Sequence, residues 1–182
     1  MFKGYNILRG INLGLNTELL IYKKRKLVNL PVKIIYDTII DIPNYHKFVP
    51  FCHESNWLDE AKTEEKSEIN DEGTKIRNAL LTVNFLLFKE SYVSKVIFQP
   101  YNFINAMAYD SEIFERLDTR WNLSALESGT AIDFSICYRF RNPFYQHLSN
   151  TFNNTIAKTM LTQFIKECTH RHNSTPQSLS NI

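Results

Sequence analysis

The feature that most constrains the fold is an amphipathic stripe that runs from residue 143 to about residue 169. Apolar side chains recur there at helical spacing: Phe144, Leu148, Phe152, Ile156, Met160 and Phe164, with Leu161, Ile165 and Cys168 widening the stripe. This period predicts one long amphipathic helix. At about 1.5 Å per residue the helix would be roughly 39 Å long, so its apolar stripe needs an equally long partner surface.

Five runs with strand character precede this helix and could supply that surface. They cover residues 74–83, 89–99, 101–109, 113–123 and 130–140. In the last two runs apolar and polar residues alternate, which predicts an antiparallel sheet with one apolar face and one solvated face. A polar, charged stretch at residues 60–73 predicts a long hairpin loop before them.

The N-terminal part of the domain adds a strand and two short helical segments. Residues 18–28 have strand character, and Pro31 suits the first position of a helix over residues 32–41. Residues 43–52 predict a helical turn followed by an extended entry into a further strand. The predicted fold class is therefore α+β, with a bent antiparallel sheet wrapped around the long C-terminal helix so that both apolar surfaces are buried.

Composition indicates one domain without a nucleic acid partner. A chain of 182 residues that is 43% apolar can bury a single core, and we expect this domain to span residues 18–170, with a flexible tail at residues 171–182. The net charge of +2 is too small to indicate nucleic acid binding. The basic cluster at residues 23–26 is expected to be a solvated strand edge, with an acidic-lipid contact as the alternative.

The cysteines and the N-terminal stretch bear on the compartment. Cys52, Cys137 and Cys168 are far apart and lack metal-binding spacing, so we expect free thiols and no metal site. Residues 1–17 contain no acidic residue and mix basic with apolar side chains, which is typical of a mitochondrial presequence; an ordinary N-terminal extension is the alternative. No apolar run has the length of a membrane-spanning helix, so any membrane contact is expected to be peripheral.

Three local patterns, in order, resemble those of a known family. Residues 45–52 (Tyr-His-Lys-Phe-Val-Pro-Phe-Cys) resemble a Tyr-x-x-Phe-x-Pro-aromatic-Cys segment, and residues 83–96 resemble a Val-Gly-Phe turn that leads to Glu-x-Tyr-x-Ser-x-Val. Residues 132–140 resemble the last strand of the same proteins. Over about residues 27–169 the chain resembles the mitochondrial coenzyme Q-binding proteins, which have the START-like helix-grip fold. It departs from their pattern at Phe51, Asn84 and Arg139, and in its longer loop at residues 60–73.

The resemblance implies a non-enzymatic lipid carrier. It implies a protein that binds ubiquinone or a related prenylquinone on the matrix side of the inner mitochondrial membrane. Such a carrier would support respiratory electron transport or coenzyme Q synthesis, alone or with the complexes that perform them. Ubiquinone would be the bound ligand, and no cofactor is expected.

A sheet bent around a helix can leave an elongated apolar tunnel, with a fully packed core as the alternative. The side chains expected to line the tunnel are Phe48, Leu80, Tyr92, Val96, Met107, Tyr109, Trp121, Phe134, Ile136, Phe152, Ile156 and Met160. Expected hydrogen-bond donors to the quinone carbonyls are Tyr92, Tyr109 and His46, with Asn78 and Asn105 as weaker choices. Smaller residues such as Ser94, Thr82 and Ala106 are expected to leave the space.

A ligand that lives in a membrane needs an entry port that touches one. The turn at residues 80–89 carries more apolar groups than a solvated turn should. We expect Phe85, Leu86, Leu87 and Phe88 to enter the bilayer, with residues 48–51 as the other lip. Packing of this turn over the end of the sheet is the alternative.

Three other functions fit the same sequence. One is a carrier of another lipid in the same tunnel. Another is a polyketide cyclase-like enzyme, for which Glu90 and His46 are the candidate acid and base. The third is a protein-interaction module with a solid core.

Overall fold

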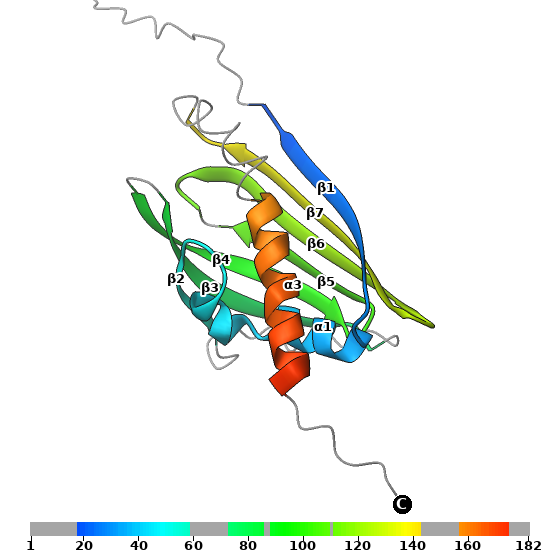
Figure 1. Ribbon diagram of the computed structural model, residues 1–182. Helices are drawn as coiled ribbons and strands as arrows, with labels where there is room; N and C mark the ends of the chain where they lie inside the picture. Colours follow the sequence, from blue (N-terminus) through cyan, green and yellow to red (C-terminus); the bar gives the residue numbers. More distant parts are fainter. Residues whose placement is uncertain (1–17, 59–72, 86–87, 110, 143–156, 175–182) are drawn as a thin grey trace, which may run out of the picture.

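The structure, a computed structural model, describes residues 18–58, 73–85, 88–109, 111–142 and 157–174. Within them the chain forms a curved sheet with helices on its concave side (Figure 1). The strands are β1 (Leu20–Val28), β2 (Cys52–Trp57), β3 (Lys75–Phe85), β4 (Phe88–Gln99), β5 (Phe103–Tyr109), β6 (Phe114–Leu126) and β7 (Gly129–Phe140). The helices are α1 (Val32–Ile40), the 3-10 helix η1 (Ile42–Lys47) and α3 (Ala157–Ser174).

The described strands form one sheet in the order β1-β7-β6-β5-β4-β3-β2, and every neighbouring pair is antiparallel. Strands β2 to β7 lie in the sheet in their order along the chain, each antiparallel to the next, and so form a meander. Strand β1 pairs with β7, so the first and last strands meet and the two helical segments after β1 must cross the sheet. Figure 1 shows β1 and β2 at opposite edges with α3 between them, in front of the sheet.

The alternation predicted for the last two strands is present. On β7, Ile132, Phe134, Ile136, Tyr138 and Phe140 are buried, whereas the residues between Ile132 and Phe140 that alternate with them are only partly buried. On β6, Trp121 and Leu123 are buried and face the same side. The sheet is therefore covered on one side, as predicted, and its concave face carries the core.

A single glycine allows β1 to lie close to the turn between β6 and β7. Gly129 has a φ of 136°, a conformation that side chains rarely tolerate. A Cβ atom at this position would lie 2.1 Å from the carbonyl oxygen of Val28. The side chain of Thr130 adds a hydrogen bond from its Oγ1 to the carbonyl oxygen of Leu30, at 2.8 Å. These contacts anchor the end of β1 and the start of α1 to the sheet.

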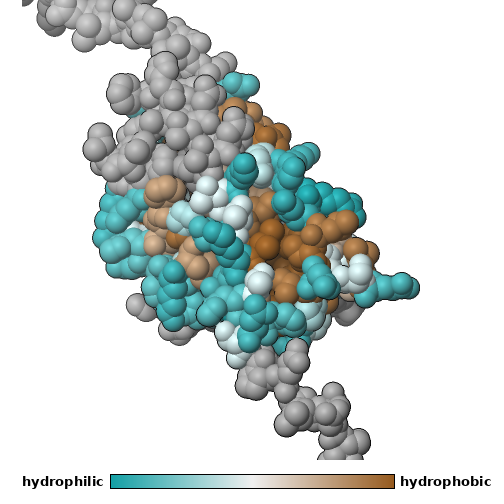
Figure 2. Space-filling view, in the orientation of Figure 1, coloured by the Kyte–Doolittle hydropathy of each residue, from teal (hydrophilic) through white to brown (hydrophobic). Residues whose placement is uncertain are grey.

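Helix α3 presents the predicted apolar stripe to the sheet. Ala157, Leu161, Phe164 and Cys168 are buried at intervals of three or four residues. Figure 2 shows apolar side chains gathered around the helix on this face, bordered by hydrophilic ones. The helix runs to Ser174, past the expected end near residue 169, because the first breaker after the stripe is Pro176.

Within the described residues the predicted elements agree with the observed ones, and the predicted fold class, an α+β fold with a bent antiparallel sheet around the C-terminal helix, is confirmed. Several expectations lie outside the described residues: the N-terminal stretch at residues 1–17, nearly all of the loop at residues 60–73, the first part of the long helix at residues 143–156 and the tail from residue 175.

Candidate functional site

A cavity of about 140 Å³ lies between the concave face of the sheet and α3. Its walls come from β3 to β7, from η1 and the residues after it, and from α3. The lining residues include Ile42, Tyr45, Val49, Phe51, Cys52, Leu81, Val83, Glu90, Tyr92, Ser94, Val96, Ile104, Ala106, Ile113, Phe114, Leu117, Thr119, Trp121, Ile136, Phe140, Met160 and Phe164. Most of these side chains are apolar, so the space suits an apolar or aromatic group.

Small side chains in the middle of the sheet leave this space. Ser94 of β4 and Ala106 of β5 face the concave side beside Val96, and Thr119 of β6 pairs with Ala106. Large aromatic residues stand around them. The ring of Trp121 lies 4.9 Å from that of Phe164 on α3, measured between centroids. The helix is thus held off the small residues by its contacts with the large ones.

Aromatic residues after α1 form one lip of the cavity. Tyr45 and Phe48 both pack edge-on against Phe164, with ring centroids 5.1 Å apart in each pair. The Tyr45 hydroxyl donates a hydrogen bond to the carbonyl oxygen of Ile39, and burial raises the pKa of this tyrosine above its ordinary value. The lip is therefore tied both to α3 and to α1.

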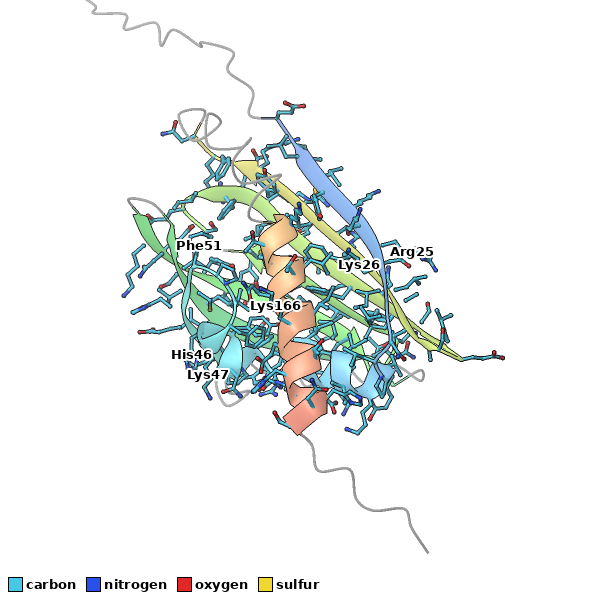
Figure 3. The ribbon with its side chains drawn as sticks, in the orientation of Figure 1. Arg25, Lys26, His46, Lys47, Phe51 and Lys166 are labelled. Carbon is cyan, nitrogen blue, oxygen red and sulfur yellow. The ribbon has the colours of Figure 1, made fainter. Side chains whose placement is uncertain are left out.

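Phe51 stands at the outer end of this lip. It lines the cavity, yet 46% of its surface is exposed, and its φ of 65° is unusual for a side chain of this size. Its carbonyl oxygen accepts a hydrogen bond from the backbone N–H of Asn84 at 2.8 Å. In Figure 3 His46 and Lys47 project from η1 away from α3. Strained conformations of this kind concentrate at functional sites.

Among the described residues that line the wall, Glu90 carries the single carboxyl group, and it is only 7% exposed. Its Oε1 accepts hydrogen bonds from the Ser111 hydroxyl at 2.6 Å and from the backbone N–H of Ile113 at 2.9 Å. Its Oε2 is buried and has no hydrogen-bond partner among the described residues. The side chain is thus fixed by one oxygen, while the other is buried without a partner.

Tyr92 follows two positions later on the same face of β4. Burial, followed by the nearby Cys52 and Glu90, raises the pKa of Tyr92 above its ordinary value. The hydroxyl therefore keeps its proton at physiological pH. Among the described residues it makes no hydrogen bond, so it can both donate to and accept from a ligand.

Five of the predicted lining residues are in the cavity wall: Tyr92, Val96, Trp121, Ile136 and Met160. The small residues Ser94 and Ala106 are there as well, whereas Thr82 lies on the other face and shares a hydrogen bond with Ser91. Phe134 packs behind the wall, with its ring 4.3 Å from that of Trp121. Phe48 packs behind Tyr45 in the lip and is likewise outside the wall.

The expected lining by Leu80, Met107 and Tyr109 is wrong. On β5 the inward positions belong to Ile104 and Ala106, so Met107 and Tyr109 point outward and are 37% and 47% exposed. On β3 the inward residue is Leu81, which places Leu80 on the opposite face. A shift of one residue along a strand exchanges its two faces, and two adjacent leucines gave no basis for choosing between them.

The other expected hydrogen-bond donors do not reach the cavity. His46 is exposed on η1, and Asn78 and Asn105 alternate with residues that face the concave side of β3 and β5. Of the remaining predicted residues, Phe152, Ile156, Leu86 and Leu87 lie outside the described residues, as do the side chains of Phe85 and Phe88. Glu90, Phe51 and Phe164 line the cavity but were not among the expected lining residues: Glu90 was predicted only as a catalytic candidate, Phe51 only as part of a lip and Phe164 only as part of the apolar stripe. The alternation of Glu90, Tyr92, Ser94 and Val96 along β4 is the signal that places Glu90 in the wall.

Within the described part of the chain, no cluster of histidine, cysteine, aspartate or glutamate side chains has the arrangement of a metal site. The three cysteines are free thiols. None of the described helices combines the length and apolar character that crossing a membrane requires.

The curated relatives of this chain include mitochondrial coenzyme Q-binding proteins. COQ10 of Dictyostelium discoideum is 29% identical over 160 residues, which cover 87% of this chain and 73% of that protein. COQ10 of Drosophila melanogaster is 26% identical over 162 residues, which cover 87% of this chain and 61% of that protein. The chain thus spans less than two thirds of the Drosophila protein.

The solved structures with a similar fold include that of the ZhuI aromatase/cyclase from Streptomyces sp. R1128. It superposes with a TM-score of 0.70 over 87% of this chain and 99% of that one, at 12% identity, which is a likeness of fold alone. The sequence itself matches the family described as polyketide cyclase / dehydrase and lipid transport over residues 28–165. Because this match covers most of the chain, the protein belongs to the polyketide cyclase / dehydrase and lipid transport family.

Proposed function

We propose that this protein is a carrier of coenzyme Q, which binds the quinone ring in the cavity between the sheet and α3. The observation that carries the proposal is the apolar cavity with Tyr92 in its wall, in a chain whose relatives are named as coenzyme Q-binding proteins. The Tyr92 hydroxyl would bond a ring oxygen, and the ring would lie against the aromatic side chains of Trp121 and Phe164.

The size of the cavity favours the ring over the tail. An engineered cavity of about 150 Å³ is known to hold a benzene molecule. A cavity of about 140 Å³ therefore suits one six-membered ring or a short piece of isoprenoid chain. A long isoprenoid tail would have to leave between the lips, past Phe51.

Binding energy should come mainly from the ring for a second reason. Removing apolar carbon from water gains about 0.8 kcal/mol per CH₂ group, but the competing site for this ligand is a bilayer. A lipid interior is as apolar as the cavity wall, so exchange of the tail between the two gains little. Recognition of the head group is then what distinguishes the ligand from other lipids.

The lip would deliver the ligand from a membrane. The exposed ring of Phe51 would enter the bilayer together with the turn between β3 and β4, where Phe85, Leu86, Leu87 and Phe88 are the predicted contacts. The membrane would be the inner mitochondrial membrane on its matrix side, and the carrier would support respiratory electron transport and coenzyme Q synthesis. Loss of co-sedimentation with liposomes on Phe51→Ser would support the contact, and unchanged co-sedimentation would remove it.

The site favours a carrier over an enzyme. Glu90 and His46 were the candidate acid and base, but His46 is exposed on η1 and is not in the wall, so the two do not form a catalytic pair. The likeness to the ZhuI aromatase/cyclase is one of fold alone, and a fold hosts many functions.

The test is to extract the ligand from protein purified from a quinone-producing host and to identify it by mass spectrometry. A near-stoichiometric prenylquinone is expected. Ala106→Leu should reduce its amount several-fold, because the added carbons project from β5 into the cavity. The matched control is Ala125→Leu, the same change at an exposed position of β6 outside the cavity, which should keep the ligand.

Two results would contradict the proposal. One is a protein that carries no prenylquinone, whether empty or filled with phospholipid. The other is a prenylquinone content that Ala106→Leu and Ala125→Leu leave equally high, because the ligand would then lie elsewhere on the protein.

A further inference from the structure

We propose that Glu90 makes the cavity selective for the reduced form of the ring, the hydroquinone, over the quinone. The inference rests on the proposed function, since it names the redox state that the same site takes. It starts from an unusual feature of the wall: a carboxyl group more than nine-tenths buried, one of whose oxygens has no partner among the described residues.

The hydrogen bonds of Glu90 are unevenly shared between its two carboxyl oxygens. Both donors that reach Glu90, the Ser111 hydroxyl and the Ile113 amide, are directed at the same oxygen, Oε1. The 2.6 Å distance from the Ser111 hydroxyl lies in the range of hydrogen bonds to an ionised carboxylate, a range that bonds to a neutral carboxyl oxygen share. In the ionised form, which the inference takes for Glu90, Oε2 can only accept, and it is buried without a donor among the described residues.

The loop that holds the carboxyl group of Glu90 is itself fixed by hydrogen bonds. Ser111 is itself buried, and its hydroxyl oxygen accepts a hydrogen bond from the Phe114 amide at 2.9 Å. Its carbonyl oxygen accepts one from Nε of Arg141 at 2.7 Å, and the Arg141 amide donates to the carbonyl oxygen of Ile113 at 2.8 Å. The loop before β6 is thus braced around Glu90, which orients the carboxylate before any ligand arrives.

Oε2 of Glu90 lacks a hydrogen-bond donor among the described residues. Buried polar atoms in native proteins nearly always have partners, and leaving a charged one without a partner is costly. The nearest polar neighbour along the same face of β4 is Tyr92, beyond which come Ser94 and the apolar Val96. A donor brought by the ligand therefore completes the site.

The two forms of the ring differ in this respect. A hydroquinone carries hydroxyl groups, one of which can donate to Oε2 of Glu90 while another meets the Tyr92 hydroxyl. A quinone carries carbonyl oxygens, which only accept, so it would place an acceptor against the carboxylate and leave Oε2 without a partner. Tyr92 serves either form, because a tyrosine hydroxyl both donates and accepts. Discrimination therefore falls to Glu90.

The test is an anaerobic titration of the purified protein with coenzyme Q1, which has a single isoprenoid unit, in its oxidised and its reduced form. We expect the hydroquinone to bind at least about tenfold more tightly, from the net worth of a hydrogen bond to a charged group. Because binding then stabilises the reduced form, the two-electron midpoint potential of the bound couple rises by about 30 mV for each factor of ten.

Glu90→Gln is the discriminating variant. The amide oxygen can still accept from Ser111 and Ile113, while the amide NH₂ replaces Oε2 and offers a donor to a carbonyl. The preference for hydroquinone should disappear or reverse. Glu115→Gln is the matched control: it removes a carboxylate from the exposed side of β6, where Glu115 pairs with Arg139, and should keep the preference.

Equal affinity of the wild-type protein for the two forms, or a preference for the quinone, would overturn the inference while leaving the proposed function intact. The inference would also be overturned, and the proposed function left intact, if Glu90→Gln kept the wild-type ratio of affinities for hydroquinone and quinone. Failure of the wild-type protein to bind either form would overturn both. A thermal melting curve shows whether Glu90→Gln folds. If it does not, the ratio of the wild-type protein's affinities for hydroquinone and quinone still tests the inference.

Discussion

Burial raises the pKa of several tyrosines of this protein. Tyr92 is almost fully buried in the cavity wall, and its pKa lies above the ordinary value of 10.0 chiefly because a phenolate there would be poorly solvated. Tyr45 and Tyr138 have pKa values raised by burial as well. All three side chains therefore favour the neutral form as long as the protein is folded.

Tyr92→Phe should make the protein less sensitive to alkali. A group whose pKa is raised by folding contributes stability that is complete below the unfolded value, near pH 10, and is lost as the pH rises beyond it. The melting temperature of the wild-type protein should therefore fall between pH 9 and pH 11.5, and that of Tyr92→Phe should fall less. Circular dichroism melting curves measure both; equal falls in the two proteins would show that Tyr92 ionises as easily folded as unfolded.

The sequence predicts that an apolar cavity is present better than it predicts which individual residues line it. Trp121, Tyr92 and Met160 are in the wall as expected, because large apolar groups on a one-sided sheet face the core. On β5 both Ala106 and its neighbour Met107 were expected in the wall, although adjacent strand residues face opposite sides, and the structure turns Ala106 inward and Met107 outward. A cavity needs small residues where a core would have large ones, so a rule that seeks the largest side chain selects the wrong face.

An ion pair of Arg171 connects α3 to the junction between α1 and η1. Arg171, near the end of α3, contacts Asp41 at 2.9 Å between Nη1 and Oδ2, and its Nε donates to Glu167 at 2.8 Å. Asp41 lies between α1 and η1, directly before the segment that forms the lip. The ion pair therefore joins the end of the gripped helix to the base of the lip, and its groups are more than two-thirds buried.

Asp41→Asn should loosen this junction. We expect it to lower the free energy of unfolding by about 1 kcal/mol and to speed release of bound coenzyme Q1, because the lip would be held less firmly. Asp37→Asn is the matched control, since the Lys33–Asp37 pair is highly exposed and should contribute little to the free energy of unfolding. Urea denaturation and stopped-flow dissociation measure the two effects; equal values for the two variants would contradict a special role for Arg171.

The ends of the helices and strands were largely predictable from the sequence. Which residues of a strand face the concave side was predictable for some strands and not for others. Each strand and α1 begins and ends within a few residues of the prediction, because proline and glycine punctuate the sequence. The phase of β7 followed from its strict alternation. That of β3 did not, because Leu80 and Leu81 are identical neighbours and only tertiary packing selects Leu81 for the cavity.

The whole molecule is a sheet that grips one helix without filling the space between them. Large rings such as Trp121 and Phe164 set the distance, and Ser94 and Ala106 leave a cavity inside it. The sequence could predict the gripping arrangement, because a long stripe needs a long surface. It could not predict the volume, which depends on how far the sheet bends and hence on contacts between residues distant in the chain.

The most direct test of the central claim uses the two tryptophans of the chain as reporters of where the ring binds. Trp121 is in the cavity wall, whereas Trp57 lies on the edge strand β2 with the guanidinium of Arg77 4.3 Å from its ring centroid. Trp57→Phe leaves only the cavity reporter, and Trp121→Phe leaves only the edge reporter. Titration with coenzyme Q1 should quench the fluorescence of Trp57→Phe to saturation, and that of Trp121→Phe only weakly and without saturation. Absence of saturable quenching in Trp57→Phe, or equal quenching in the two variants, would contradict binding of the ring in this cavity.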